Sequence, residues 1–184
     1  EFISPEQRYE ADATMATDHH MQKNFILSGP RKALLSGNKV EVLKTLKANG
    51  ENVQVSYCKA VSAWVVCSKN VALVARNKGD VASASYDAPR YAFAREMANV
   101  WFDKLDQIQG EKGDAALADI KKDFDGRTFI GEYIGSQEHQ HLVKYSRVTI
   151  IFYAVVENLS TEDCLPCDQA WTLFDKWGLD KVKI

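Results

Sequence analysis

The tetrapeptide Lys47-Ala48-Asn49-Gly50 contains a residue type that could do covalent chemistry. A lysine amine has a pKa of about 10.4 in water and cannot act as a nucleophile while it is protonated. Burial, a neighbouring cation or a metal ion can lower that pKa, and the free amine could then attack a nucleotide α-phosphate to form a phosphoramide. The same tetrapeptide is also typical of a surface lysine beside a hairpin turn, so both interpretations stay open here.

Other segments contain groups that a bound nucleotide would need. Glu132 could hold a ribose hydroxyl or a water on Mg²⁺, and an aromatic residue of the run over 148–156 could stack on a purine. The ordinary alternatives are an exposed strand carboxylate and a core aromatic residue.

These groups must be positioned by strands and helices, and the hydrophobic pattern predicts an α+β fold with antiparallel sheets and packed helices. Strands are predicted between Val40 and Arg76, with Lys47 at the end of one strand and a tight turn at Asn49-Gly50 before the next. The remaining predictions are helices within 94–108, 115–124 and 170–177, and strands over 128–134 and 148–156.

The composition describes an ordinary globular chain. Of its 184 residues, 46% are hydrophobic and 26% charged, and the formal net charge is −2, which excludes a histone-like polybasic surface. The longest apolar run is too short to cross a bilayer, so we expect no membrane partner.

Four cysteines are too few for a disulfide framework, so we expect an intracellular compartment, nuclear or cytoplasmic. Residues 1–24 are predicted to form a polar arm or helix, and residues 25–184 one domain.

Two smaller patterns could indicate metal or redox chemistry. Cys164 and Cys167 form a Cys-x-x-Cys, but no second pair lies at zinc spacing, so a structural role is expected. His139 and His141 would share one side of a strand, as metal ligands can, although hydrogen-bonded histidines without a metal are the simpler interpretation.

The order of the segments resembles the signature motifs of the covalent nucleotidyltransferases, which include ATP-dependent RNA and DNA ligases and mRNA capping enzymes. The most similar pattern is that of the ligase domain of fungal- and plant-type tRNA ligases. The segments that carry the resemblance are Lys47-Ala48-Asn49-Gly50, then Val65-Val66-Cys67-Ser68-Lys69-Asn70, then Glu132-Tyr133 with His141-Leu142-Val143-Lys144-Tyr145, then Ile151-Phe152-Tyr153 through Asn158, and Phe174-Asp175-Lys176-Trp177-Gly178.

The resemblance implies a nucleotidyltransferase (ATP-grasp-like) fold, ATP and Mg²⁺ as cofactors, and RNA ends, tRNA halves in particular, as substrates. It implies that ATP adenylates Lys47, that Glu132 contacts the ribose and the metal, and that Tyr153, or Phe152 in the other strand register, stacks on adenine. The AMP would pass to an RNA 5′-phosphate and leave when a 3′-hydroxyl attacks. The remaining nucleotide-binding residues that it implies are Asn49, Gly50 and Lys69. With RNA as the substrate, four cations become candidate phosphate contacts, although a plain surface cation is the simpler interpretation of each: Lys69, Arg76, Lys78 and Lys144.

The pattern departs from the family at its end. No Glu-Gly-hydrophobic strand follows residue 158, so Lys181-Val182-Lys183 is only superficially similar to the final motif. We therefore expect a domain truncated at its C-terminus that adenylates itself poorly or not at all. The intact protein is expected to be monomeric and to carry kinase and cyclic phosphodiesterase domains. The alternatives are a capping guanylyltransferase, a DNA ligase, an inactive nucleotide- or RNA-binding module, or an unrelated α+β domain.

Overall fold

The computed structural model describes residues 32–39, 42–135, 143–158 and 164–184. The chain divides into two compact units, Glu1–Lys44 and Thr45–Ile184. In the first unit the described residues form one short helix over 32–35, and the prediction for residues 1–24 lies outside the described residues. Every predicted site residue belongs to the second unit.

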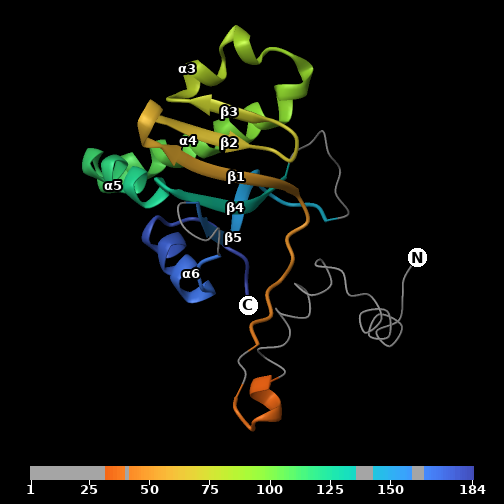
Figure 1. The fold of residues 1–184 in the computed structure, drawn as a ribbon. Coiled ribbons are helices and arrows are strands. Elements are labelled where there is room, and N and C mark those ends of the chain that lie inside the picture. The colour runs from red at the N-terminus through yellow and green to blue at the C-terminus, as the bar shows by residue number, and fades with distance from the viewer. Residues whose placement is uncertain (1–31, 40–41, 136–142, 159–163) are drawn as a thin grey trace, which may run out of the picture. The chain divides into compact units, whose positions relative to one another are not determined.

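The second unit is built on a five-stranded antiparallel sheet with the strand order β3-β2-β1-β4-β5 (Figure 1). This arrangement confirms the α+β class with antiparallel strands and packed helices. The strands predicted over 128–134 and 148–156 are present, each shifted by no more than one residue at either end. The bounds are β1 Glu51–Cys58, β2 Ala63–Cys67, β3 Ala72–Ala75, β4 Arg127–Ile134 and β5 Thr149–Glu157.

The strand and turn predicted around Lys47 are wrong. Residues 42–49 have no regular secondary structure, and Gly50 is not among the described glycines with a positive φ. The glycine is needed for space instead, because an added Cβ would overlap the carbonyl oxygen of Tyr133 and lie 2.8 Å from Ile134 Cγ2. Close contact with β4, rather than turn geometry, explains the glycine.

The three predicted helices are present as α4 Ala92–Lys112, α5 Asp114–Phe124 and α6 Cys167–Lys176. Helix α4 continues past Gly110, the predicted end, and stops at Gly113, whose φ is 81°. Gly178 follows α6 with a φ of 58°, so a left-handed glycine comes just after the helix end. A short helix, α3 Lys78–Val81, follows β3.

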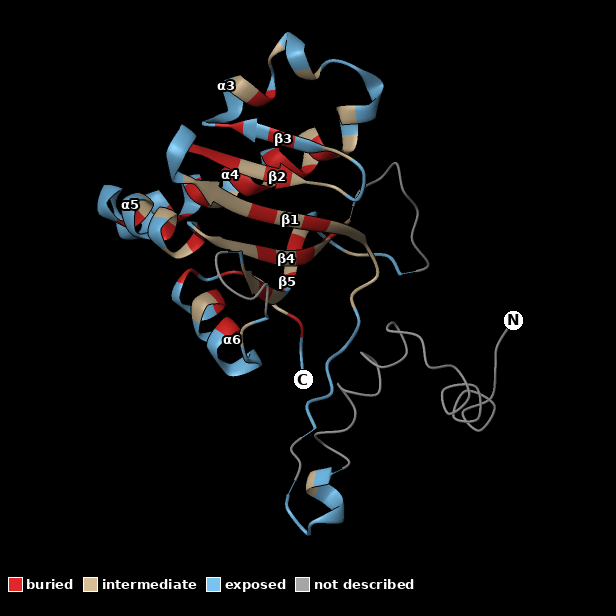
Figure 2. Cartoon of the chain, in the orientation of Figure 1, coloured by how far each residue is buried: buried red, intermediate tan, exposed pale blue. Residues whose placement is uncertain are grey.

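All three long helices pack on the same face of the sheet through aromatic side chains. Trp101 of α4 contacts Trp64, Phe124 of α5 stacks on Phe129 with centroids 3.6 Å apart, and Phe174 of α6 contacts Phe129. The buried strand residues alternate with half-buried ones, as Figure 2 shows by colour. The core therefore lies between these helices and one face of the sheet.

The opposite face is polar along β1 and β4, and α4, α5 and α6 do not cover it. Asn52, Gln54 and Ser56 alternate with the buried valines of β1, and Thr128 and Glu132 occupy the same face of β4. All five are half-buried. We call this surface the polar face. No helix among the described residues is long and apolar enough to cross a membrane.

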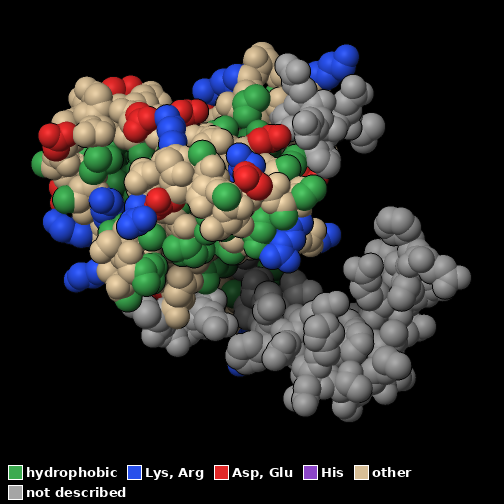
Figure 3. All heavy atoms as spheres, turned by 90° about the horizontal axis from the view of Figure 1, so that it is seen from above, with side chains coloured by type: hydrophobic (Ala, Val, Ile, Leu, Met, Phe, Trp, Pro, Cys, Tyr) green, Lys and Arg blue, Asp and Glu red, His purple; other side chains and the backbone are tan. Residues whose placement is uncertain are grey.

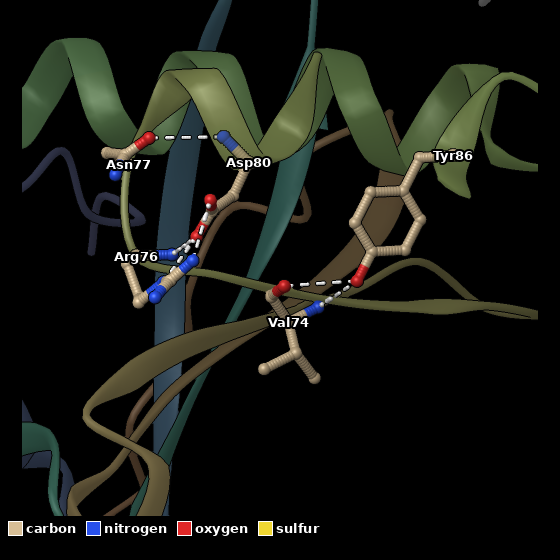
Figure 4. A network of polar contacts seen from close by, with 5 residues as sticks. All are labelled: Val74, Arg76, Asn77, Asp80 and Tyr86. Carbon is tan, nitrogen blue, oxygen red and sulfur yellow. Dashed lines mark hydrogen bonds and ion pairs between the residues drawn. The ribbon is translucent and has the colours of Figure 1, made fainter. Parts of the chain in front are cut away.

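Both edges of the sheet are occupied. At β3, the Tyr86 hydroxyl donates to the Val74 carbonyl at 3.0 Å and accepts from the Val74 N–H at 3.1 Å, while Asp80 accepts from the Arg76 N–H (Figure 4). At β5, Phe152 exchanges backbone hydrogen bonds with Asp180 and Val182. These contacts satisfy edge groups that would otherwise attract another strand.

Replacing Tyr86 with Phe should destabilise the fold by about 1 kcal/mol and increase self-association through β3, because Val74 loses both partners. Urea denaturation and concentration-dependent light scattering measure the two effects. Tyr91→Phe is the control, since the Tyr91 hydroxyl accepts from the Arg90 side chain and not from the sheet. A Tyr86→Phe protein as stable and monodisperse as the wild type would contradict the edge-sealing role.

Candidate nucleotide site

Antiparallel pairing brings several distant segments to one end of the sheet, which we call the site end. Strand β1 begins there, β2 turns into β3, β4 ends and β5 begins, as the pairs Glu51–Tyr133, Gln54–Cys67 and Ile134–Thr149 establish. In Figure 1 this is the right-hand end of the sheet. The Lys47–Gly50 segment and the turn at 68–70 therefore lie at the same end of the sheet as Glu132.

Lys47 lies at this end, but its side chain is exposed. Among the described residues its Nζ contacts only the neighbouring Ala48 carbonyl, at 3.4 Å. The strand predicted to end at Lys47 is therefore absent from the described residues, and the side chain is not buried.

The segment after Lys47 is held on two sides. The Asn49 N–H donates to the Tyr145 hydroxyl at 2.8 Å, and Gly50 packs against Tyr133 and Ile134. The Asn49 Oδ1 atom is buried and receives no hydrogen bond from the described part of the chain. A buried acceptor without a donor is costly, so this oxygen could accept a hydrogen bond from a ligand.

Glu132 and Tyr153 meet on the polar face. Glu132 pairs with Asn52 across β1 and β4, and the Asn52 Nδ2 donates to the Tyr153 hydroxyl at 3.2 Å. Glu132 Oε2 is buried, and none of the described residues donates to it. Burial raises the pKa of Tyr153, the hydrogen bond from Asn52 lowers it, and the negative charge of Glu132 raises it.

A β-bulge places Tyr153 on this face. Ile130 pairs with Ala154 and Gly131 with Phe152, so Tyr153 is the extra residue of β5. Gly131 leaves no space for a side chain here, since an added Cβ would lie 2.8 Å from Ile150 Cγ2 and 2.9 Å from the Ile151 carbonyl oxygen. The bulge is a feature that strand alternation in the sequence does not predict.

Phe152, which was predicted as the alternative stacking residue, is a core residue. Its side chain is 2% exposed and packs with Trp101, Phe129 and Phe174 on the helical side of the sheet. The stacking role is therefore open only to Tyr153, which is 36% exposed on the polar face.

The four cations named as RNA contacts do not lie together. Lys69, in the β2–β3 turn, and Lys144, next to Tyr145, are exposed at the site end. Arg76 and Lys78 lie beyond the far end of β3, and both are neutralised: Arg76 by Asp80 at 2.8 Å, and Lys78 by two aspartates at 2.6 Å. A contact between these two residues and RNA stays a prediction, and they lie apart from Lys69 and Lys144.

The surface over α3 and the β3 edge carries charges of both signs. Figure 3, which looks at the molecule from above, shows Lys and Arg interspersed with Asp and Glu. The Arg76 guanidinium also holds the pKa of Asp80 below its ordinary value, as expected for a closed pair.

The described residues contain no group of three His, Cys, Asp or Glu side chains that could hold a metal ion. Glu132 can supply one carboxylate, so a bound Mg²⁺ would take its remaining ligands from phosphate oxygens and water. Cys164 and Cys167 are free and exposed, and His139 and His141 lie outside the described residues.

A cavity of about 470 Å³ lies on the other side of the sheet, between α4, the start of β5 and residues 178–180. Phe152 is the only predicted site residue in its lining. It is therefore separate from the group at the site end.

Three residues of the site end were missed or underused by the sequence analysis. Asn52 and Gln54 were not named as candidate site residues, and Tyr145 was named only as part of a motif. Alternation does predict that Asn52 and Gln54 share a face, but their contact with a residue of β5 depends on the strand order.

Comparison of the chain with protein-family models and with curated proteins finds no match in either.

Replacing Gly50 with Ala should destabilise the fold by about 1–3 kcal/mol, because the new methyl group overlaps the β4 backbone. Gly110→Ala is the matched control. Nothing lies within 4 Å of its added Cβ, and its helical position predicts a gain of about 0.5–1 kcal/mol. Chemical denaturation measures both, and an unchanged Gly50→Ala protein would refute the close packing of this segment on β4.

Replacing Glu132 with Gln should lower the pKa of Tyr153, because a negative charge that disfavours the phenolate is removed. Tyrosinate absorbance, with the Tyr153→Phe titration subtracted, isolates this group. Glu157→Gln, at the far end of β5, should leave the pKa unchanged. An unshifted Tyr153 pKa in Glu132→Gln would show that the two side chains are not coupled.

The raised pKa of Tyr153 also links the stability of the fold to pH. Because the folded-state pKa lies above the ordinary 10.0, the stability linked to this group is complete below pH 10 and is lost as the pH rises through the folded pKa.

Proposed function

We propose that this chain is a nucleotide-binding portion of an ATP-dependent RNA ligase of the tRNA-splicing type. The observation that carries the proposal is the position of three motif-like segments, distant in sequence, at one end of one sheet. They bring Lys47, Glu132 and Tyr153 to this end, together with two buried acceptor oxygens that lack a donor within the described part of the chain. Hydroxyl or amino groups of a nucleotide would satisfy such acceptors.

Each residue has a role in this proposal. Glu132 Oε2 accepts a hydrogen bond from a ribose hydroxyl, and Asn49 Oδ1 accepts one from a second donor group of the ligand. The Tyr153 ring stacks on adenine. Lys69 and Lys144 are the cations available to phosphates at the site end. When bound, Mg²⁺ supplies charge neutralisation on the phosphates. RNA ends, tRNA halves in particular, are the proposed substrates, and kinase and phosphodiesterase domains are proposed for the intact protein.

The chemistry is a sequence of phosphoryl transfers. The deprotonated Lys47 amine attacks the α-phosphorus of ATP, a P–N bond forms and pyrophosphate leaves. An oxygen of the RNA 5′-phosphate then attacks the same phosphorus, and the P–N bond breaks. Finally, an RNA 3′-hydroxyl attacks the 5′-phosphate and AMP leaves. Positioning dominates such reactions, which is why a rigid sheet end suits them.

The exposure of Lys47 favours a second candidate, a module that binds a nucleotide without forming a covalent intermediate. Such a module would use Glu132, Asn49 and Tyr153 in the same way. It differs from the ligase in having no use for the lysine amine. Labelling therefore separates the two candidates.

Incubation of the longest natural chain that contains this sequence with α-labelled ATP and Mg²⁺ should label it covalently, and Lys47→Ala should abolish the label. Lys44→Ala is the control, because it removes an exposed lysine three positions away. Label that persists in Lys47→Ala would overturn the nucleophile. Binding of ATP without any label would favour the non-covalent module. Labelling by GTP would identify a capping enzyme, and sealing of nicked DNA a DNA ligase.

A further inference from the structure

A chain of side-chain hydrogen bonds on the polar face runs from β1 over β4 to β5. The Gln54 Nε2 donates to Asn52 Oδ1 at 3.1 Å, and the Asn52 Nδ2 donates to the Tyr153 hydroxyl at 3.2 Å. Since β4 lies between β1 and β5, the contact between Asn52 and Tyr153 bridges β4 at Glu132, the cross-strand partner of Asn52. The Glu132 Oε2 atom on this strand is hidden from solvent.

The direction of the hydrogen bonds has a chemical consequence. Because Gln54 occupies the carbonyl oxygen of the Asn52 amide, the amide nitrogen faces Tyr153. The phenol oxygen is thus an acceptor in this contact, and its own proton remains available to another acceptor. Because the hydrogen bond already restricts the orientation of the Tyr153 side chain, less conformational entropy is lost when a ligand stacks on its ring.

We propose that Asn52, oriented by Gln54, is a positioning residue that holds Tyr153 across β4 beside Glu132, where the ring and the carboxylate act on one ligand. The ligand part of this proposal rests on the proposed nucleotide function. Asn52 acts through the Tyr153 hydroxyl and makes no contact with the ligand itself. This distinguishes it from a residue that binds the nucleotide directly.

The test is a double-mutant cycle for ATP affinity, measured by calorimetry on the 184-residue chain. Asn52→Ala and Tyr153→Phe should each weaken binding about five-fold, the value of about one hydrogen bond. The double variant should be no weaker than Tyr153→Phe alone, because the two residues act as a unit. Asn158→Ala removes another amide of the sheet, one bonded to Thr128, and should not change the affinity.

A second measurement does not depend on the nucleotide. Asn52→Ala should raise the pKa of Tyr153 further, since it removes a donor that stabilises the phenolate, and Asn158→Ala should not. An unchanged Tyr153 pKa in Asn52→Ala would overturn the proposal. Additive losses in the cycle would overturn it too, because Asn52 would then contact the ligand itself. A wild-type chain that does not bind ATP would overturn the proposed function and the ligand role, while the pKa shift would still decide whether Asn52 holds Tyr153.

Discussion

Stacking of Phe124 on Phe129, with an interplanar angle of 9°, holds α5 against β4, and the other large aromatic residues pack around this pair. Trp64, Trp101, Phe152 and Phe174 are almost fully buried in the same cluster. Such side chains supply most of the apolar area of a small core, and truncating one costs about 3–5 kcal/mol. Because α4, α5 and α6 each contribute to this cluster, they lie together on one face. The opposite face of the sheet, the polar face, is therefore left without a helix on it.

The polarity of the uncovered face follows from strand geometry. Valines that point into the aromatic core alternate along β1 with Asn52, Gln54 and Ser56, which must then point away from it. Once those side chains lie on one surface, they form hydrogen bonds with each other, as Gln54 does with Asn52 and Ser56 with Thr128. Glu132 Oε2 is left without a donor among the described residues, which makes this part of the face a candidate for binding rather than for folding.

The contrast between Lys47 and Glu132 shapes the functional proposal. The carboxylate is half-buried with a hidden oxygen, so its environment already favours a hydrogen-bond donor from outside. The amine is exposed and, within the described part of the chain, contacts only its neighbouring backbone. Ligand recognition thus has more support in the structure than covalent chemistry has. The covalent mechanism remains the leading proposal because the segments occur in the order of the family's motifs.

Much of the fold could be predicted from the sequence because its elements are local. Helical spacing found α4 through Ala94, Met97, Trp101 and Leu105, and alternation found β1, since periodicity depends only on neighbouring residues. The candidate residues Lys47, Glu132 and Tyr153 could also be proposed from the sequence, because their side-chain chemistry and their order along the chain do not depend on the fold. The sequence could not exclude Phe152 as the stacking residue, because its burial depends on residues far along the chain.

Only the tertiary structure decided which of these residues meet. The bulge at Gly131 sets the register that puts Phe152 in the core and Tyr153 on the polar face, and it depends on pairing between two separate strands. The role of Gly50 depends on the position of Tyr133, and the bond from Asn52 to Tyr153 on a strand order that places β4 between them. Local periodicity therefore determined the elements, whereas long-range packing, which no short window of sequence contains, determined the site.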